Sequence, residues 1–145
     1  MTPLPYQLQL VRWSEAAPLL RIVRESVFIQ EQQVPVELEW DEFDPVCIHV
    51  LALTQDGKPV GTARLLPNGH IGRMAVIKSW RGKGIGRAML QCLLDTAKQN
   101  GITEIKLNSQ ISAKAFYERF GFQVSGDEFM EADIPHIKMF LTLFG

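Results

Sequence analysis

Apolar residues recur along this chain with two periods, one typical of helices and one typical of strands. A helical period begins after Ser14, which can cap a helix, and this helix should end near Gln33, because the residue before Pro35 is disfavoured in the α region. Its apolar positions are Ala16, Leu20, Val23 and Val27. A longer amphipathic helix is predicted from Lys83 to the stop signal Asn100-Gly101.

Apolar runs of strand length separate the helices. Two of them flank Gln55-Asp56-Gly57-Lys58, a good hairpin turn, and the next follows the turn Pro67-Asn68-Gly69. The expected strands are Tyr6–Val11 and residues 46–54, 59–66, 69–77, 104–108, 123–129 and 136–144, with a short helix over 112–120. This order predicts one α/β (α+β) domain over residues 1–145, with a mixed, mostly antiparallel sheet flanked by helices rather than a doubly wound sheet.

The composition argues against several classes of protein. Fifteen Lys and Arg residues against sixteen Asp and Glu residues leave a net charge of −1, which gives no footprint for nucleic acid. No apolar run approaches the length of a membrane span, and no signal pattern opens the chain. Cys47 and Cys92 lie far apart, and the histidines are scattered without metal-ligand spacing. We therefore expect a reducing, cytoplasmic setting, no membrane partner and no metal site.

The most informative segment lies between the fourth strand and the long helix. Arg81-Gly82-Lys83-Gly84-Ile85-Gly86-Arg87 has alternate glycines that let backbone N–H groups approach a ligand, and a helix start favours an anion such as pyrophosphate. The spacing fits neither the dinucleotide fingerprint nor the Walker loop, and reads R-x-x-G-x-G. Basic residues surround the segment: Arg73, Lys78, Arg81, Lys83 and Arg87. A plain glycine turn with a solvated basic face is the alternative interpretation.

R-x-x-G-x-G after a fourth strand resembles the acyl-CoA pyrophosphate loop of the GNAT superfamily of N-acetyltransferases. A second segment, from Ala113 to Phe122, is similar to the A-x-x-[LF]-Y-E-x-x-G-F element of that family, and the resemblance covers essentially the whole chain. A finer resemblance, to the small bacterial ElaA-like group, rests on residues 27–41 and on Ile134-Pro135-His136. Asp133 departs from that pattern, since a glycine commonly stands there, and Asp tolerates a positive φ less well than Gly.

The resemblance implies the GNAT acyl-CoA N-acyltransferase fold, acetyl-CoA as the co-substrate, and the residues that bind it. The backbone of Met74, Ala75 and Val76 would pair with the pantetheine arm. The pyrophosphate would lie against Arg81, Gly82, Lys83, Gly84, Ile85, Gly86 and Arg87. Gln110 stands where many members carry an Asn that contacts the CoA arm. A backbone N–H near Val76 would stabilise the oxyanion, and Tyr117 would protonate the leaving thiolate; the alternative for Tyr117 is a packed aromatic residue.

The base that deprotonates the acceptor is not identified by the sequence. Four residues are candidates because their segments wall the acceptor side in this family: Glu31, Glu39, Asp41 and His136. For each of them a structural role is an equally good interpretation. Acidic residues there would suit a cationic amine, whereas Arg73 would favour a carboxylate or phosphate on the acceptor, so the two indications conflict.

Two functions follow from the sequence. The first is an N-acetyltransferase that moves the acetyl group of acetyl-CoA directly to a primary amine of a small molecule or peptide. The second is a non-catalytic acyl-CoA-binding regulatory module, which would keep the loop without turnover. We also consider it possible for the chain to form a homodimer, as a hypothesis.

Overall fold

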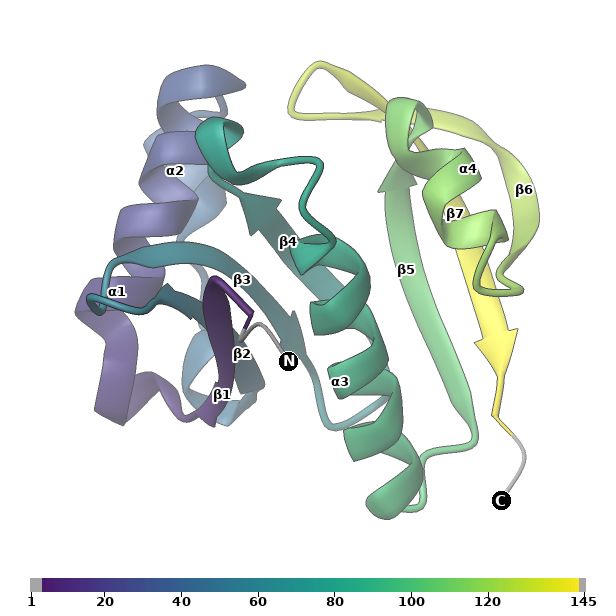
Figure 1. The fold of residues 1–145 in the computed structure, drawn as a ribbon. Coiled ribbons are helices and arrows are strands. Elements are labelled where there is room, and N and C mark those ends of the chain that lie inside the picture. Colours follow the sequence, from purple (N-terminus) through teal and green to yellow (C-terminus); the bar gives the residue numbers. More distant parts are fainter. Residues whose placement is uncertain (1–3, 144–145) are drawn as a thin grey trace.

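The computed structural model describes residues 4–143, which form two antiparallel sheets side by side (Figure 1). The first sheet has the order β1-β2-β3-β4: β1 (Tyr6–Val11), β2 (Ile48–Thr54), β3 (Pro59–Leu65) and β4 (Ile71–Val76). The second has the order β5-β7-β6: β5 (Glu104–Gln110), β6 (Gln123–Glu131) and β7 (Ile134–Thr142). The predicted element order, the mostly antiparallel pairing and the first strand are confirmed.

Helical segments connect these strands. Those before β2 are α1 (Trp13–Arg24), the π-helix η1 (Glu25–Glu31), α2 (Val36–Glu39) and the 3-10 helix η2 (Asp44–Val46). Between β4 and β5 lie η3 (Lys78–Trp80) and α3 (Ile85–Gln99), and between β5 and β6 lie η4 (Ile111–Ala113) and α4 (Lys114–Glu118). Across residues 4–143, no helix has the length and apolar character needed to cross a membrane.

The main core lies where α3 packs on the two sheets. α3 buries an apolar stripe that includes Ile85, Met89 and Leu93, as its helical period predicts. The helix lies so close to β3 that a Cβ at Gly61 would be 3.0 Å from Cγ2 of Ile85, so any larger residue here would have to displace that side chain. The packing holds the N-terminus of α3 beside the end of β4.

The two sheets meet at β4 and β5 and then separate. An isolated parallel bridge joins His70 to Lys106, and the Lys106 N–H donates to the Gly69 carbonyl at 3.1 Å. Beyond this bridge the two strands run in the same direction and diverge towards their carboxyl ends (Figure 1). The end of β4 therefore has β3 on one side and an unpaired edge on the other, next to the glycine-rich loop.

The first helix differs from its prediction at both ends. It begins at Trp13, and its N-cap is Arg12 rather than Ser14; the Arg12 N–H donates to the Glu15 carboxylate at 2.8 Å. From Glu25 the chain widens into the π-helix η1, which ends at Glu31, before the expected Gln33. Short π-helical segments occur frequently at functional sites, and η1 contributes to the site described below.

Other boundaries shift for local reasons. α3 begins at Ile85 rather than at Lys83, because its N-cap Gly84 has a φ of +85°. The strand expected over 46–54 begins at Ile48, since Pro45 lies in η2, and the helix expected over 112–120 is replaced by η4 and the shorter α4. β6 ends at Glu131 and β7 begins at Ile134, closer together than the expected 129 and 136, because a tight turn joins them. Phe144, the expected end of the last strand, lies outside the described residues.

The turn between β6 and β7 carries backbone strain. Ala132 and Asp133 have φ of +51° and +61°, the conformation for which hairpins favour Asn-Gly. Left-handed backbone costs an L-residue about 1–2 kcal/mol, less for Asp, and glycine loses part of this gain through its freer unfolded chain. We expect Asp133→Gly to raise the free energy of unfolding by about 0.5–1 kcal/mol in urea titrations.

The matched control is Asp127→Gly, an exposed position inside β6 without a positive φ. This change should not raise stability, because it relieves no positive φ and glycine adds freedom to the unfolded chain. If Asp133→Gly is no more stable than the wild type, the positive φ of Asp133 does not cost the fold free energy.

Candidate active site

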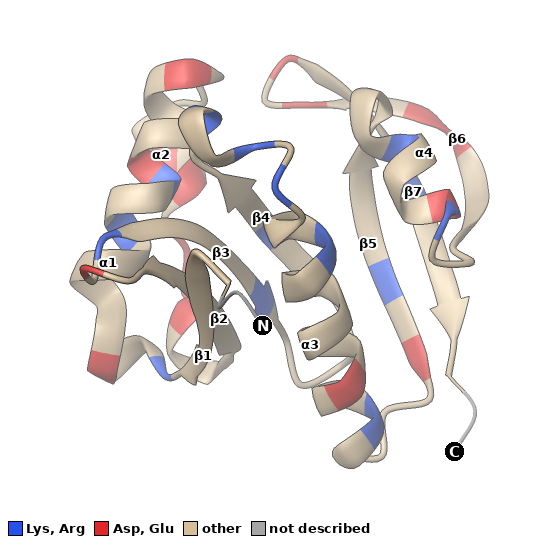
Figure 2. Ribbon diagram, in the orientation of Figure 1, with Lys and Arg blue, Asp and Glu red and all other residues tan. Residues whose placement is uncertain are grey.

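The glycine-rich loop joins the end of β4 to the start of α3. Gly82 and Gly84 have φ of +79° and +85°, and a Cβ at either would meet nothing within 4 Å, so backbone conformation rather than crowding requires glycine here. Lys and Arg gather in this loop and in the first turn of α3, as the blue segments of Figure 2 show. The unbonded N–H groups at the start of the 15-residue α3 add a partial positive charge. The loop is therefore suited to a phosphate group.

A cavity of ≈ 1030 Å³, here called the loop cavity, opens beside this loop. It is lined by most of the residues predicted to bind the cofactor: Met74, Ala75, Val76, Arg81, Gly82, Gly84, Ile85, Gly86, Arg87 and Tyr117. Lys83 and Gln110 are not among its lining residues, and Nζ of Lys83 lies 5.8 Å from the Trp80 ring centroid. Its volume lies at the upper end of the range typical of small-molecule and cofactor sites.

Val76 turns its backbone polar groups away from β3. The Ile77 N–H donates to Val60 at 2.9 Å and Ala75 stands opposite Thr62, so the intervening Val76 N–H and C=O face the unpaired edge. The carbonyl of Val76 accepts a hydrogen bond from Nε of Arg81 at 2.8 Å. The N–H rather than the carbonyl is thus the group that Val76 offers to a ligand.

Arg81 makes a two-point ion pair with Glu31 of η1. Its terminal nitrogens lie 2.6 and 2.7 Å from the two carboxylate oxygens. These hydrogen bonds lower the pKa of Glu31 and raise that of Arg81. A carboxylate with a lowered pKa is a poorer base, and the contact gives Glu31 a positioning role at the end of β4.

Tyr117 lies on α4 with its ring buried between aromatic neighbours. Phe116 and Phe122 pack edge-on against it, with centroid distances of 5.1 and 5.7 Å. Its hydroxyl is 3.7 Å from Sδ of Met74 on β4. Burial raises the pKa of Tyr117 to about 12, so the hydroxyl keeps its proton at neutral pH.

A second cavity of ≈ 390 Å³, the side cavity, adjoins the first. Its walls come from both sheets and from the segment that includes η1 and α2. Four residues line both cavities: Gln32, Met74, Ala113 and Tyr117. The two cavities therefore meet at the hydroxyl-bearing residue that the sequence motif singled out.

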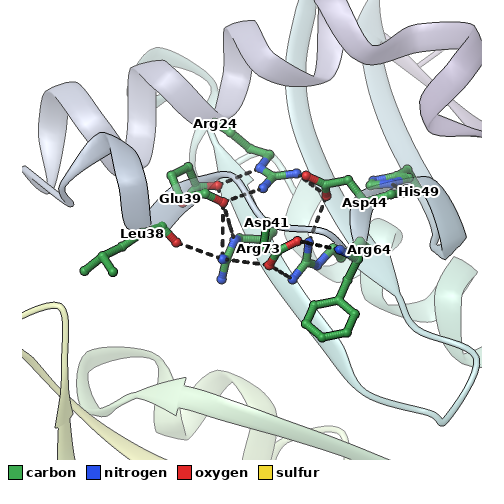
Figure 3. Close-up of polar contacts among 9 residues, drawn as sticks. Arg24, Leu38, Glu39, Asp41, Asp44, His49, Arg64 and Arg73 are labelled. Atoms are coloured by element: carbon green, nitrogen blue, oxygen red, sulfur yellow. Dashed lines mark hydrogen bonds and ion pairs between the residues drawn. The ribbon is translucent and has the colours of Figure 1, made fainter.

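One wall of the side cavity is backed by a closed ring of ion pairs (Figure 3). Three arginines alternate with three carboxylates in the order Arg24, Glu39, Arg73, Asp41, Arg64, Asp44 and back to Arg24, with N···O distances of 2.6 to 3.3 Å. Arg24 and Asp44 are shielded from solvent, whereas the side chains of Asp41 and Arg73 are 24% and 26% exposed. The charges balance, so the ring contributes no net charge to the cavity.

The ring gives two of the candidate bases a structural role. Oε2 of Glu39 lies 2.6 Å from Nε of Arg24 and 3.3 Å from Nε of Arg73. Burial raises the pKa of Glu39 against the pull of these arginines. At Asp41 burial acts in the same direction, but hydrogen bonds from Arg64 outweigh it and lower the pKa to about 2. Both carboxylates are held by arginines rather than presented to an acceptor.

His136 is the remaining candidate, and it lines the side cavity. Its Nδ1 lies 2.7 Å from the Ile134 carbonyl and must carry the hydrogen of that bond, so in the neutral ring the lone pair is on Nε2. Nε2 is 3.6 Å from Oε2 of Glu131, and the ring stacks on Phe129 with a centroid distance of 5.9 Å. His136 is thus an oriented imidazole with an available acceptor nitrogen.

Sequence reasoning missed four polar residues of the side cavity: Gln32, His70, Asn108 and Glu131. They come from the end of η1, the start of β4, β5 and the β6–β7 hairpin, so no local pattern connects them. Nε2 of Gln110 donates to Oε1 of Gln32 at 2.9 Å, which places Gln110 in the side cavity. A usable signal was strand alternation, since Asn108 and Gln110 share one face of β5.

Comparison with known proteins agrees with this geometry. Residues 26–143 match the family described as Acetyltransferase (GNAT) domain. A Bacillus subtilis (strain 168) protein provisionally named an acetyltransferase is 41% identical over 123 residues, which cover 81% of this chain and 83% of that protein. Escherichia coli ElaA superposes with a TM-score of 0.83 at 28% identity, over 93% of this chain and 98% of ElaA. An acyl-CoA N-acyltransferase from Pseudomonas aeruginosa gives a TM-score of 0.84 at 29% identity, with coverage of 93% and 98%.

The family match spans both the glycine-rich loop and the Tyr117 helix. The resemblance predicted from two short motifs is confirmed, as is the fold that it implied. None of the proteins named here favours the non-catalytic module. The chain belongs to the GNAT acetyltransferase family and is an N-acetyltransferase.

Proposed function

We propose that this N-acetyltransferase binds acetyl-CoA in the loop cavity and a primary amine in the side cavity, and joins them at Tyr117. The observation that carries the proposal is that Tyr117 lines both cavities, with its hydroxyl 3.7 Å from Met74 on β4. A group that must reach both the donor and the acceptor belongs at such a junction.

The donor half of the proposal rests on the loop and the end of β4. The GNAT fold uses acetyl-CoA. Its pyrophosphate would accept hydrogen bonds from N–H groups between Gly82 and Gly86, with Lys83 and Arg87 supplying charge nearby. In this proposal Arg81 acts through the end of β4, because its guanidinium is held by Glu31 and the Val76 carbonyl. It would shape the strand end on which the acyl group lies.

The chemical step needs an oxyanion donor and an acid. The lone pair of the uncharged amine attacks the thioester carbonyl, a C–N bond forms, and the C–S bond breaks. The N–H of Val76 would face the developing oxyanion. Tyr117 would give its hydroxyl proton to the leaving thiolate, and the pKa of about 12 keeps that proton available at neutral pH.

We assign the proton acceptor on the amine side to His136. His136→Asn should lower kcat by about 10²-fold or more, because the amine then loses its proton to water alone. His70→Asn is the matched control, since His70 lines the same cavity and should change kcat by less than about threefold. Equal losses in both variants would argue against His136 as the base.

The proposed function is tested by following thiol release from acetyl-CoA across a panel of primary amines, with acetyl-CoA binding measured in parallel by calorimetry. We expect micromolar binding, and thiol release that requires an amine and yields its N-acetyl product. Tight binding without release from any amine would instead support the non-catalytic module.

The cellular setting remains a proposal from the cysteines. Cys47 and Cys92 are both free in the structure. Free thiols are typical of reducing compartments, so we propose a cytoplasmic location. Detection of the tagged protein in the fractions of lysed cells tests this location, and recovery outside the cytoplasmic fraction would contradict it.

A further inference from the structure

The geometry of the side cavity points to an acceptor that carries a carboxylate as well as its amine, with Arg73 as the residue that recognises the carboxylate. This inference rests on the proposed function, because it names the substrate class of the same site. It also bears on the conflict in the sequence, where acidic residues suggested a cationic acceptor and Arg73 an anionic one.

Arg73 lines the side cavity with part of its guanidinium uncommitted. Nε and Nη2 donate to the carbonyls of Leu38 and Glu39 and to the Asp41 carboxylate, at 3.2 to 3.3 Å. Nη1 carries two further N–H donors, and within residues 4–143 they have no hydrogen-bond partner. The anchored side of the guanidinium fixes its plane, and Nη1 is left as a charged donor for an anion.

The backbone of Arg73 is strained in a way that orients this side chain. Its φ is +51°, and the pairing of β3 with β4 shifts register between Thr62 and Arg64 at this point. Three steps along β4, from Gly72 to Ala75, oppose two along β3, which is a β-bulge. Bulges redirect side chains beside active sites, and strained backbone persists where the surroundings hold it. Here the ion-pair ring holds it.

The two walls of the side cavity differ in charge once the ion pairs of the ring are counted. Glu39 and Asp41 are balanced by arginines, so they do not make the β4 wall acidic. The β6–β7 wall instead carries Glu131, whose side chain is 51% exposed, beside Nε2 of His136. Arg73 on one wall therefore lines the same cavity as an acid and an imidazole on the other.

An acceptor with an amine but no anionic group would leave the free donors of Arg73 unused. An acceptor with an anionic group but no amine would lack the nucleophile. A small amino carboxylate satisfies both walls, with its amine towards His136 and Tyr117. The ≈ 390 Å³ of the side cavity suits a molecule of that size. The spacing between the two groups is then the property that the cavity selects.

The test compares ω-amino acids from glycine to 5-aminopentanoate with n-alkylamines of matched length, scored as kcat/KM for thiol release. Aminoalkylphosphonates form a third arm, which distinguishes a carboxylate from a phosphate-like anion. For the preferred length, we expect the amino acid to exceed its alkylamine by about 10–100-fold, the worth of a charge-assisted pair. Arg73→Gln should bring this ratio close to one, and Arg73→Lys should keep part of it.

The outcomes distinguish the carboxylate inference from the proposed function. Alkylamines that react as well as the amino acids, phosphonates that react best, or a preference that survives Arg73→Gln would overturn the carboxylate inference while leaving the acetyltransferase intact. Thiol release from no arm, with acetyl-CoA still bound, would overturn the proposed function and the inference with it. If Arg73→Gln fails to fold, the comparison on the wild type decides alone.

Discussion

Replacing Asp44 with asparagine should cost the protein about 3–5 kcal/mol of its free energy of unfolding. Oδ1 of Asp44 lies 2.7 Å from Nη1 of Arg24 and 2.8 Å from Nη1 of Arg64, and its side chain is 2% exposed. The change keeps the size of the side chain but removes its charge, so two buried guanidinium groups face each other across an amide. Domains of this size are stable by about 5–15 kcal/mol, so the loss is a large fraction of the total.

The measurement is urea unfolding followed by circular dichroism, with the midpoint and the slope fitted separately. Asp95→Asn is the matched control, because Asp95 is an exposed residue on α3 that accepts a hydrogen bond from Gln91 at 2.9 Å. It should change stability by less than about 0.5 kcal/mol. A small effect at Asp44 would show that the ring is not needed to hold α1, η2 and β3 together.

Tyr117→Phe should lower kcat by about 10²–10⁴-fold while acetyl-CoA binds as tightly as before. The ring of phenylalanine keeps the packing against Phe116 and Phe122, and the lost hydroxyl contacts a weakly accepting sulfur. The effect should therefore appear in the chemical step rather than in folding or binding. Single-turnover rates with saturating acetyl-CoA and amine, together with calorimetric binding, separate the three.

The raised pKa of Tyr117 also predicts how the stability of this variant depends on pH. Because its folded-state value of about 12 lies above the ordinary 10.0, burial of the neutral phenol stabilises the fold below pH 10.0, and this contribution is lost as the pH rises through about 12. Tyr117→Phe should lack that alkaline loss of stability.

Tyr6→Phe is the control for the effect on kcat. Tyr6 is buried in β1 and lines neither cavity, so the change should leave kcat unchanged. Full activity in Tyr117→Phe would remove it as the acid.

The donor side of the site could be predicted because its features are local in sequence. The positive φ of Gly84 and the strand-to-helix turn depend on a few neighbouring residues, and Tyr117 stands in a motif of ten. Element order was likewise predictable from period and turn residues. The π-helix η1 was not, since its apolar spacing continues that of α1.

On the acceptor side Glu39, Arg73 and His136 could be named from the sequence, but not their roles, because those depend on contacts between distant segments. Arg24 and Asp44 are 20 residues apart, and Arg81 and Glu31 are 50 apart. In the sequence, Glu39 and Asp41 suggested either a base or a solvated acidic loop. Which charge meets which is decided by the packing of α2 against β4 and η1, and no periodicity in the chain encodes that.

The central claim is that the acetyl group passes directly from acetyl-CoA to an amine where the two cavities meet. It is tested most directly by following carbon-labelled acetyl-CoA with a reactive amine from the panel, and measuring free thiol, N-acetyl product and intact protein mass in the same time course. The account predicts that thiol and N-acetyl product appear at equal rates, with no label on the protein. Label retained on the protein, or thiol released without an N-acetyl product, would contradict it.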